Sequence, residues 1–544
     1  MINGSLGRVN RAERAVLRTA RSGEPIDIVL DQRDRPIRAH VLADLLTRRR
    51  GNHALRLTGA TITGPVDLTG SRLDFPVELR ECHFDEPVRL AEAQLGSLRL
   101  PGCRLPHLDY ARQLRTSGAV ELNEGFTARV DLAGARIDGH LSLDSAHLTG
   151  DADHPGIDAE RTLIEQGVFG RETTVDGEMR LSHARISGPV VLDESRLRNP
   201  GRRALNTEYS TIDSQFSMRD LVADGEVHLV GSRISGDLGM PRARLNTPNA
   251  LALSADSLTV DRSLMCSGLV ANGAVNLIGA QIGGALAFVN TTVRQPHGWA
   301  LLLIETDALL LTLRLAPESE GAISLRDGRF GRLTDDPPHW PEKCTIELTG
   351  THYQRVTQRN TDVEPCPIGT RLKWMHQHSI TTPSAVTDPA APATFSPAPY
   401  AQLAAALQRD GFDQDARRVQ RFKERRRHRA MGPLGACWGA LQDITVGFGH
   451  RPALALAWLT GLLASGTTYF SVAGPVTAVK KGESPTWDPF LYSLDLLIPL
   501  VDLGHDKAWD PTGWSKAVAL ALIISGWVLA TTVVAGAGRV LNRS

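Results

Sequence analysis

Two groups of residues in this chain have types and spacings that could support chemistry. The first comprises Cys344, His352, Cys366, His376 and His378, whose thiols and imidazoles are side chains that zinc prefers. Their spacings match no compact zinc pattern, so we interpret them as packing cysteines and surface histidines. The sequence also has no Gly-rich phosphate loop between strand and helix, no CxxC pair and no haem or flavin motif. It therefore predicts no metal, no cofactor and no catalytic residue, and hence no enzyme.

The second group lies between two charge-free stretches near the C-terminus. A helix start at Asp488-Pro489 precedes FLYSLDLLIP, which is too short to cross a bilayer. One hypothesis is a re-entrant segment at 488–500 that helps to line a cation pore in a homo-oligomer, because acidic rings select cations. Its residues are Asp495, Pro499, Asp502 and Gly504. The alternative is an interfacial helix on the outer leaflet, with Trp487, Trp509 and Trp514 among the headgroups.

A basic segment precedes the first charge-free stretch. The run YAQLAAALQRDGFDQDARRVQRFKERRRHRAM predicts two helices about Gly411. The second helix carries Lys423, Arg425, Arg426, Arg427 and Arg429. Beside a hydrophobic span, this pattern predicts contact with anionic lipid headgroups, and a solvated helix face is the alternative. Nucleic acid is not an expected partner, because few aromatic residues interleave the basic ones.

The two charge-free stretches, 452–479 and 517–538, are longer than the roughly 20 residues that cross a bilayer. They predict transmembrane helices near 452–473 and 516–538. Basic residues precede the first of these helices and follow the second, which predicts that both termini are cytoplasmic. The N-terminal segment 1–24 carries charges throughout and predicts no signal peptide. We therefore expect a two-span protein of the cell membrane with residues 475–514 outside.

Length and composition indicate what kind of fold positions these residues. A chain of 544 residues exceeds the size of one hydrophobic core, so more than one structural unit is expected. Its 60 basic residues balance 60 acidic ones, which leaves no overall field to attract nucleic acid. The 50 glycines and 5% aromatic content suit a fold with many tight corners and few large core side chains.

An eleven-residue repeat dominates the first half of the chain. Its blocks are apolar at offsets 0, 2, 5 and 7, as in Val66, Leu68, Ser71 and Leu73, and then in Val77, Leu79, Cys82 and Phe84. A helical period would place offsets 0 and 2 on different faces, and strict alternation fails between offsets 2 and 5. Short sides with two inward residues, separated by corners, fit the pattern. The sequence therefore predicts a β-solenoid.

A longer, 48-residue period contains four such blocks and a few extra residues. The extra residues fall in four proline-bearing loops at 149–156, 198–204, 246–250 and 294–300. If one coil takes two blocks, these loops emerge at the same corner of every second coil and stack into a ridge. We interpret the ridge as a surface for a protein partner. Its prolines are Pro155, Pro200, Pro248 and Pro296.

The repeat resembles the pentapeptide-repeat family over about residues 55–330, with VDLTG, SRLDF, VELRE, CHFDE and CRLPH as direct matches. The resemblance implies a right-handed parallel β-helix with quadrilateral coils. An extra Pro or Gly before most blocks departs from the family pattern. From PYAQLAAALQRDGFDQDARRV to YSLDLLIPLVDLGHDKAW, the chain also resembles a two-helix module of bacterial membrane proteins. Some of these are labelled membrane-associated oxidoreductases, for which the residues here offer no support.

Together these patterns predict a mainly β protein with five segments. They are an α/β cap at 1–50, the solenoid at 51–335, irregular coils and a Pro/Ala-rich linker at 336–399, a basic helical pair at 400–432 and a transmembrane hairpin at 433–544. The predicted function is a membrane-tethered, non-catalytic scaffold that binds a protein partner on the cytoplasmic face. A two-helix pore regulated by the solenoid is one alternative, and an oxidoreductase is the second.

Overall fold

The computed structural model divides the chain into two compact units, Met1–Ala393 and Thr394–Ser544, which we describe separately. It describes the whole chain except residues 1–9, 11–12, 15–25, 30–35, 49–53, 110, 152, 359–365, 381–394, 434, 436, 438, 441–451, 480–485, 499–502 and 542–544. Residues 381–394 of the Pro/Ala-rich linker and most of the first 35 residues of the expected N-terminal cap lie outside the described residues.

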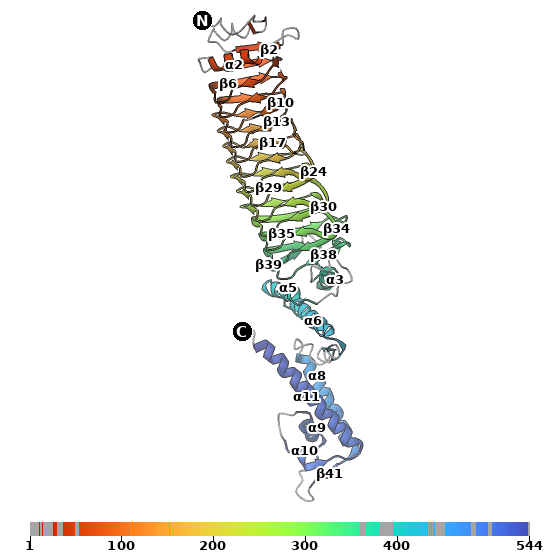
Figure 1. The fold of residues 1–544 in the computed structure, drawn as a ribbon. Coiled ribbons are helices and arrows are strands. Elements are labelled where there is room, and N and C mark those ends of the chain that lie inside the picture. Colours follow the sequence, from red (N-terminus) through yellow and green to blue (C-terminus); the bar gives the residue numbers. More distant parts are fainter. Residues whose placement is uncertain are drawn as a thin grey trace. The chain divides into compact units, whose positions relative to one another are not determined.

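The first unit is a β-solenoid of about 14 turns, whose strands stack one above another in Figure 1. Its strands pair in parallel with the strand one coil further on, and Val66 pairs with Val88. Val66 and Val77 are 2% and 3% exposed, so the predicted inward ladder is confirmed. Strands labelled in Figure 1 include β2 (Pro36–Arg38), β6 (Arg72–Arg80), β10 (Arg104–Asp109), β13 (Thr127–Asp131), β35 (Asp307–Leu315), β38 (Cys344–Glu347) and β39 (His352–Gln358).

Long and short coils alternate along the solenoid. Val190 of β23 (Val190–Val191) pairs with Phe216 of β26 (Phe216–Ser217) across a long coil, and Phe216 pairs with Leu238 of β29 (Leu238–Gly239) across a short one. The next two coils repeat the pattern, as Leu238 pairs with Leu264 and Leu264 with Leu286. One long and one short coil, from Val190 to Leu238, together make up the 48-residue period that the sequence predicts.

Tight corners between the sides place one residue of each corner in the left-handed region. Many of these residues are not glycine, and they include Glu92, Arg161, Glu172, His183, Glu194, Tyr209 and Asp220, with φ between 52° and 61°. Each corner is stabilised by hydrogen bonds to the next coil, as when the Glu172 amide donates to the Asp193 carbonyl at 3.0 Å. The coil geometry therefore overrides the preference of these residues for negative φ.

Helices cover both ends of the solenoid. At the N-terminal end, α2 (Ala39–Arg48) buries Leu42 and Leu46 beside inward residues of the first coils. The coils continue past residue 335 through β37 (Arg329–Asp335), β38 and β39. They are covered by α3 (Ile368–His378), a helix that the sequence patterns did not indicate, and the next strand, β40 (Ser379–Ile380), pairs in parallel with β38. Both covers shield apolar coil interiors and strand edges that would otherwise be open to association.

The second unit is helical. Helices α5 (Ala398–Arg409) and α6 (Asp413–Ala430) meet at Gly411, whose φ is 82°, and Leu403 and Val419 are buried. Helices α8 (Pro452–Ala473), α9 (Pro489–Leu497), α10 (His505–Ala508) and α11 (Trp514–Leu541) follow, with a two-stranded antiparallel sheet of β41 (Thr477–Ala478) and β42 (Trp509–Asp510).

The short helix α9 packs against both long helices of this unit. An added Cβ at Gly466 of α8 would lie 3.1 Å from Ser493 Oγ, and one at Gly526 of α11 would clash with the Leu497 carbonyl oxygen. These two glycines therefore let the helices approach closely. Around Tyr492, ring centroids lie 5.0 Å from Phe470 and 5.2 Å from Trp487.

The predicted transmembrane hairpin is wrong. Among the described residues, no helix is both long enough and apolar enough to cross a membrane. The prediction relied on the absence of charge, but the described part of α8 carries hydroxyl side chains that make it less apolar. They are Thr460, Ser465, Thr467, Thr468 and Ser471. The two-span membrane localisation, with a cytoplasmic solenoid and termini, is contradicted by the same finding.

Candidate functional site

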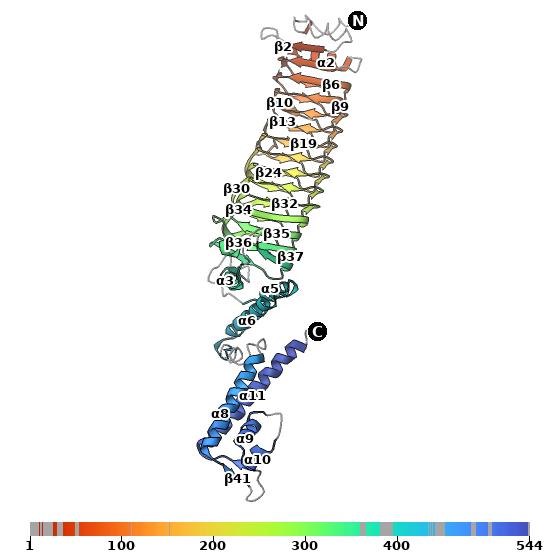
Figure 2. The same ribbon diagram turned by 180° about the vertical axis from the view of Figure 1, so that it is seen from behind.

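The proline loops emerge where the sequence period places them, and Figure 2 shows their strands from behind. Three of them lie within β24 (Arg196–Asn206), β30 (Arg244–Ser254) and β34 (Gln281–Leu302). Their prolines, Pro200, Pro248 and Pro296, are exposed, whereas Pro155 in the first loop is half-buried. We call the four loops 149–156, 198–204, 246–250 and 294–300 the loop ridge.

The last three loops share one tip geometry. Each proline precedes a residue in the left-handed region, namely Gly201 at 73°, Asn249 at 61° and His297 at 58°. Proline fixes φ near −65°, and a following positive φ is the signature of a type II turn. The first loop differs, because Asp151 accepts hydrogen bonds from the amides of Asp153 and His154, both at 2.8 Å. The tips are thus held by local backbone geometry.

Between the loops, the short coils turn on a glycine that recurs once in each 48-residue period. Gly177, Gly225, Gly273 and Gly321 all have φ between 93° and 136°. A Cβ at Gly225 would lie 2.6 Å from the Asn199 carbonyl oxygen, and one at Gly273 would lie 2.5 Å from that of Thr247. Only glycine therefore lets the short turn fit beneath the neighbouring loop.

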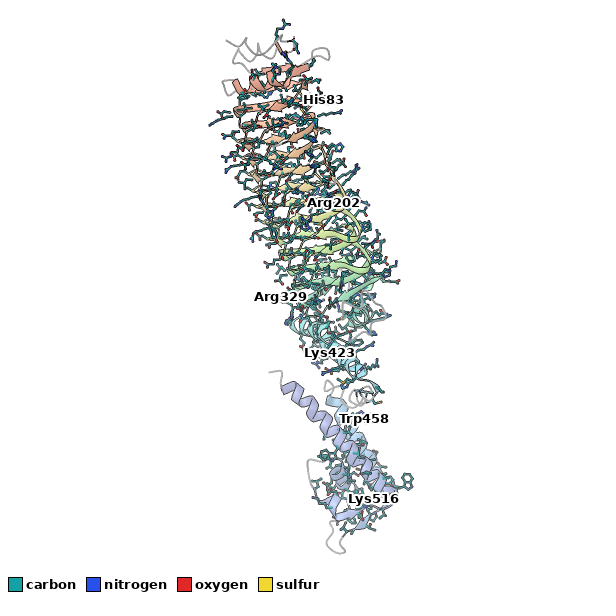
Figure 3. All side chains as sticks on the ribbon, in the orientation of Figure 1. His83, Arg202, Arg329, Lys423, Trp458 and Lys516 are labelled. Atoms are coloured by element: carbon teal, nitrogen blue, oxygen red, sulfur yellow. The ribbon has the colours of Figure 1, made fainter. Side chains whose placement is uncertain are left out.

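A cavity of about 420 Å³ opens where the first two loops flank the turn at Gly177. This volume lies in the range of small-ligand pockets. Its lining is almost wholly polar, and Figure 3 labels one lining residue, Arg202, at the edge of the stacked strands. The lining residues are Asp151, Asp153, His154, Pro155, Glu178, Arg180, Asn199, Arg202, Arg203 and Glu226.

Hydrogen bonds hold the deeper side chains of the cavity in place. Glu178 Oε2 accepts from Arg180 Nη2 at 2.6 Å, and Asn206 Nδ2 donates to Glu178 Oε1 at 2.9 Å. Arg180 also donates to Asp158 at 3.1 Å. Glu226 Oε1 lies 2.7 Å from His228 Nδ1. These contacts fix the rotamers before any ligand arrives, which lowers the entropic cost of binding.

Two carboxyl groups at the cavity have shifted pKa values. Burial raises the pKa of Asp158, the partner of Arg180. Burial also acts to raise the pKa of Glu226, but hydrogen bonds from His228 and Ser254 lower it below its usual value. The floor of the cavity therefore keeps an ionised Glu226 at neutral pH.

The repeats provide an internal comparison for these polar residues. Arg203 pairs in register with Glu226, whereas the equivalent pairs one and two periods later are Leu251 with Ala274 and Trp299 with Ala322. Glu178 occupies the position equivalent to Glu226, directly after the turn glycine. Because the same coil geometry forms with apolar residues at these positions, the charges of Arg203 and Glu226 are not required for folding.

No protein-family model, curated protein or solved structure matches this chain. The site must therefore be judged on its own geometry. Of the residues selected from the sequence, Pro155 lines the cavity and Pro200 lies at the tip of the loop beside it. Sequence reasoning missed Glu178, Arg180, Arg203 and Glu226. Comparing equivalent positions across the 48-residue period would have revealed Glu178, Arg203 and Glu226, since these charges give way to apolar residues, but not Arg180, whose equivalents are His228, Asn276 and Ser324.

The basic residues proposed to meet lipid lie on α6, where Figure 3 labels Lys423. Lys423 Nζ lies 3.6 Å from Glu424 Oε1, and the Arg426 guanidinium lies 5.4 Å from the Phe422 ring centroid. Arg425, Arg427 and Arg429 are exposed. Binding of this face to anionic headgroups stays a prediction.

The residues proposed to line a pore divide into two groups. Pro499 and Asp502 lie outside the described residues. Asp495 is 7% exposed, and its carboxylate accepts hydrogen bonds from the amides of Leu503 at 2.8 Å and Asp506 at 2.9 Å. Gly504, with φ of 76°, precedes α10. In this arrangement, Asp495 stabilises the start of α10.

We expect Asp495→Ala to destabilise the second unit by about 1–3 kcal/mol, because two backbone amides lose their acceptor. Asp495→Asn should cost less, since one carbonyl oxygen remains. Thermal unfolding followed by near-ultraviolet circular dichroism of the Trp487 and Tyr492 rings measures both. Asp488→Ala is the matched control, and loss of its cap to the Phe490 amide should cost about 1 kcal/mol. Equal stability of Asp495→Ala and the unmodified protein would contradict this role.

Proposed function

We propose that the protein is a non-catalytic binding scaffold, in which a pentapeptide-repeat-like solenoid presents the loop ridge to a protein partner. The observation that supports this most strongly is the charged cavity at the ridge, whose pair Arg203 and Glu226 is replaced by Leu and Ala, and by Trp and Ala, in the next two periods. Polar residues at positions where the fold also forms with apolar residues are typical of binding surfaces. The loops are also dispensable for strand pairing, because the short coils pair with their neighbours without such a loop.

A solenoid suits this role for a physical reason. Each coil contacts its neighbours alone, so insertions at a corner leave the stacked interior intact. The inward residues beside the second loop, Leu197 and Leu205, are 1% and 0% exposed, which matches residues of the short coils. The loops can therefore change sequence to fit a partner without changing the fold.

The test replaces the second loop with the turn that the next coil already uses. Residues 198–204 become Asp-Gly-Glu, copying the turn at 224–226 and converting a long coil into a short one. Because the replacement copies a native turn, the variant should fold with unchanged circular dichroism. We expect it to lose most of the chemical cross-links to partner proteins that the unmodified chain forms in its native host.

The control variant changes a corner away from the ridge, with Glu194→Gly at a left-handed position. This substitution should leave the cross-links unchanged, since glycine favours the native conformation there. Partner cross-links that persist after loop replacement, or that depend equally on Glu194, would contradict the proposed function. The oxidoreductase stays a hypothesis. The two-helix pore was predicted to form from the transmembrane hairpin, which no described helix supports.

A further inference from the structure

The two walls of the cavity carry opposite charges. The first loop contributes Asp151 and Asp153, and the second contributes Arg202 and Arg203. Asp151 is occupied by its own loop, where its carboxylate accepts from two amides and lies 3.0 Å from His154 Nδ1. Asp153 is exposed, and within the described part of the chain its carboxylate has no hydrogen-bond or ionic partner. The acidic wall thus offers one open carboxylate at the rim.

The basic wall faces it from two coils away. Arg202 is exposed at the rim, and the Arg203 guanidinium donates to Glu208 at 3.1 Å while 40% of its side chain stays accessible. Stacked coils lie about 4.8 Å apart, so the two walls are separated by roughly 10 Å. Between them, Glu178 pairs with Arg180, and one coil beyond the basic wall Glu226 Oε1 lies 2.7 Å from His228 Nδ1.

From this arrangement we infer that the cavity binds an extended peptide segment with one basic and one acidic side chain about three residues apart. An extended chain advances about 3.4 Å per residue, so the Cα atoms of residues three apart lie roughly 10 Å apart, which matches the separation of the two walls. A ligand of a single charge would meet one favourable and one repulsive wall. The inference rests on the proposed function and names the chemistry of the partner at that same site.

The cavity size agrees with this ligand. A volume of about 420 Å³ accommodates a short peptide segment and not a folded domain. The position of the cavity among protruding loops leaves it accessible to a segment of another protein. The fixed floor rotamers supply both donors and acceptors, which suits the polar backbone of a peptide.

Four synthetic peptides test the inference by fluorescence anisotropy with the full chain. The probes are acetylated, amidated and dye-labelled, and contain Lys-Ser-Ser-Glu, Lys-Ser-Ser-Lys, Glu-Ser-Ser-Glu or Gln-Ser-Ser-Gln between glycines. We expect the dipolar peptide to bind about fivefold more tightly than each of the other three. The preference should shrink at high salt, because the rim charges are exposed. Tighter or equal binding of a singly charged or neutral peptide, or no measurable binding, would overturn the inference.

Two variants connect the preference to the walls. Asp153→Arg replaces the open carboxylate of the acidic wall with a guanidinium, and we expect it to reverse the order, so that Glu-Ser-Ser-Glu binds most tightly. Arg203→Leu combined with Glu226→Ala copies the pair Leu251 and Ala274 of the next period, so it should fold normally and reduce the dipolar preference to below twofold. Arg233→Leu, at an exposed position outside the cavity lining, is the control and should keep the full preference. An unchanged order in Asp153→Arg would overturn the inference.

The inference and the proposed function fail differently. If loop replacement abolishes partner cross-links but the dipolar peptide shows no preference, the ridge binds a partner of other chemistry and the inference is wrong. If the dipolar peptide binds as expected but cross-links survive loop replacement, the cavity is a peptide site and the ridge is not the main partner surface.

Discussion

Arg371→Ala should destabilise the C-terminal end of the solenoid by about 3–5 kcal/mol, the largest effect that we expect from a single side chain. Arg371 of α3 donates to Asp335 through Nη1 at 2.8 Å and Nη2 at 2.6 Å, and the two side chains are 8% and 3% exposed. Removing the guanidinium leaves a buried carboxylate without its cation. The covering helix should then detach from the last coils.

Local hydrogen exchange measures this effect better than global unfolding, because repeat proteins do not unfold in one step. We expect amides of β37 and β39 to lose protection in Arg371→Ala, while those of β13 stay unchanged. The double variant Arg371→Met with Asp335→Leu is the matched control and should restore most of the protection, since a buried ion pair can be replaced by apolar residues. Unchanged exchange at β37 in the single variant would refute the capping role of α3.

Gly225→Ala should cost about 3 kcal/mol or more at the second loop. Its φ of 136° is unfavourable for any residue with a Cβ, and that Cβ would lie 2.6 Å and 2.9 Å from the carbonyl oxygens of Asn199 and Arg202. These neighbours are backbone atoms, which cannot move away from the added Cβ as the end of a flexible side chain could. We therefore expect the loop to shift, with faster exchange at the Val227 and Leu205 amides.

Gly201→Ala separates the two contributions. Gly201 also has a positive φ, 73°, but an added Cβ there meets nothing within 4 Å. The substitution Gly201→Ala should therefore lower the stability by only about 1 kcal/mol, from backbone strain alone. Equal destabilisation by the two substitutions, measured by urea unfolding with hydrogen exchange at the same amides, would show that the close approach beneath the loop contributes nothing.

The solenoid could be predicted from the sequence because its signal repeats. Each inward position, such as Val66 and Val77, recurs many times, so single exceptions do not obscure the period. The 48-residue period also placed Pro200 and Pro248 at equivalent positions on the loop ridge. Repetition therefore makes the solenoid predictable even though the sequence pattern of any single short strand is weak.

Features that occur once were not predicted. The helix α3 has three buried apolar residues, Leu372, Trp374 and Met375, too few for a clear helical period. Its anchoring pair joins residues 36 positions apart, which local patterns cannot show. Left-handed corners at Glu172 and Tyr209 carry no sequence signal, because these residues normally avoid positive φ.

The C-terminal prediction failed for a different reason. Freedom from charge in 452–479 was taken as sufficient for a membrane span, although hydroxyl side chains are frequent there. The described part of the unit has a core of its own, formed by residues of α8, α9 and α11 that include Phe470, Tyr492 and Leu522. Contacts between helices, which determine this core, are not visible in a hydropathy pattern.

Site-specific photocross-linking tests most directly whether the loop ridge is the binding surface. A benzophenone amino acid replaces Pro200, Pro248 or Glu194 one at a time in the full chain, and the protein is irradiated in its native host. We expect positions 200 and 248 to capture the same partner, while position 194, at a corner outside the ridge, captures none. Capture at 194 but not at 200 or 248 would contradict the account.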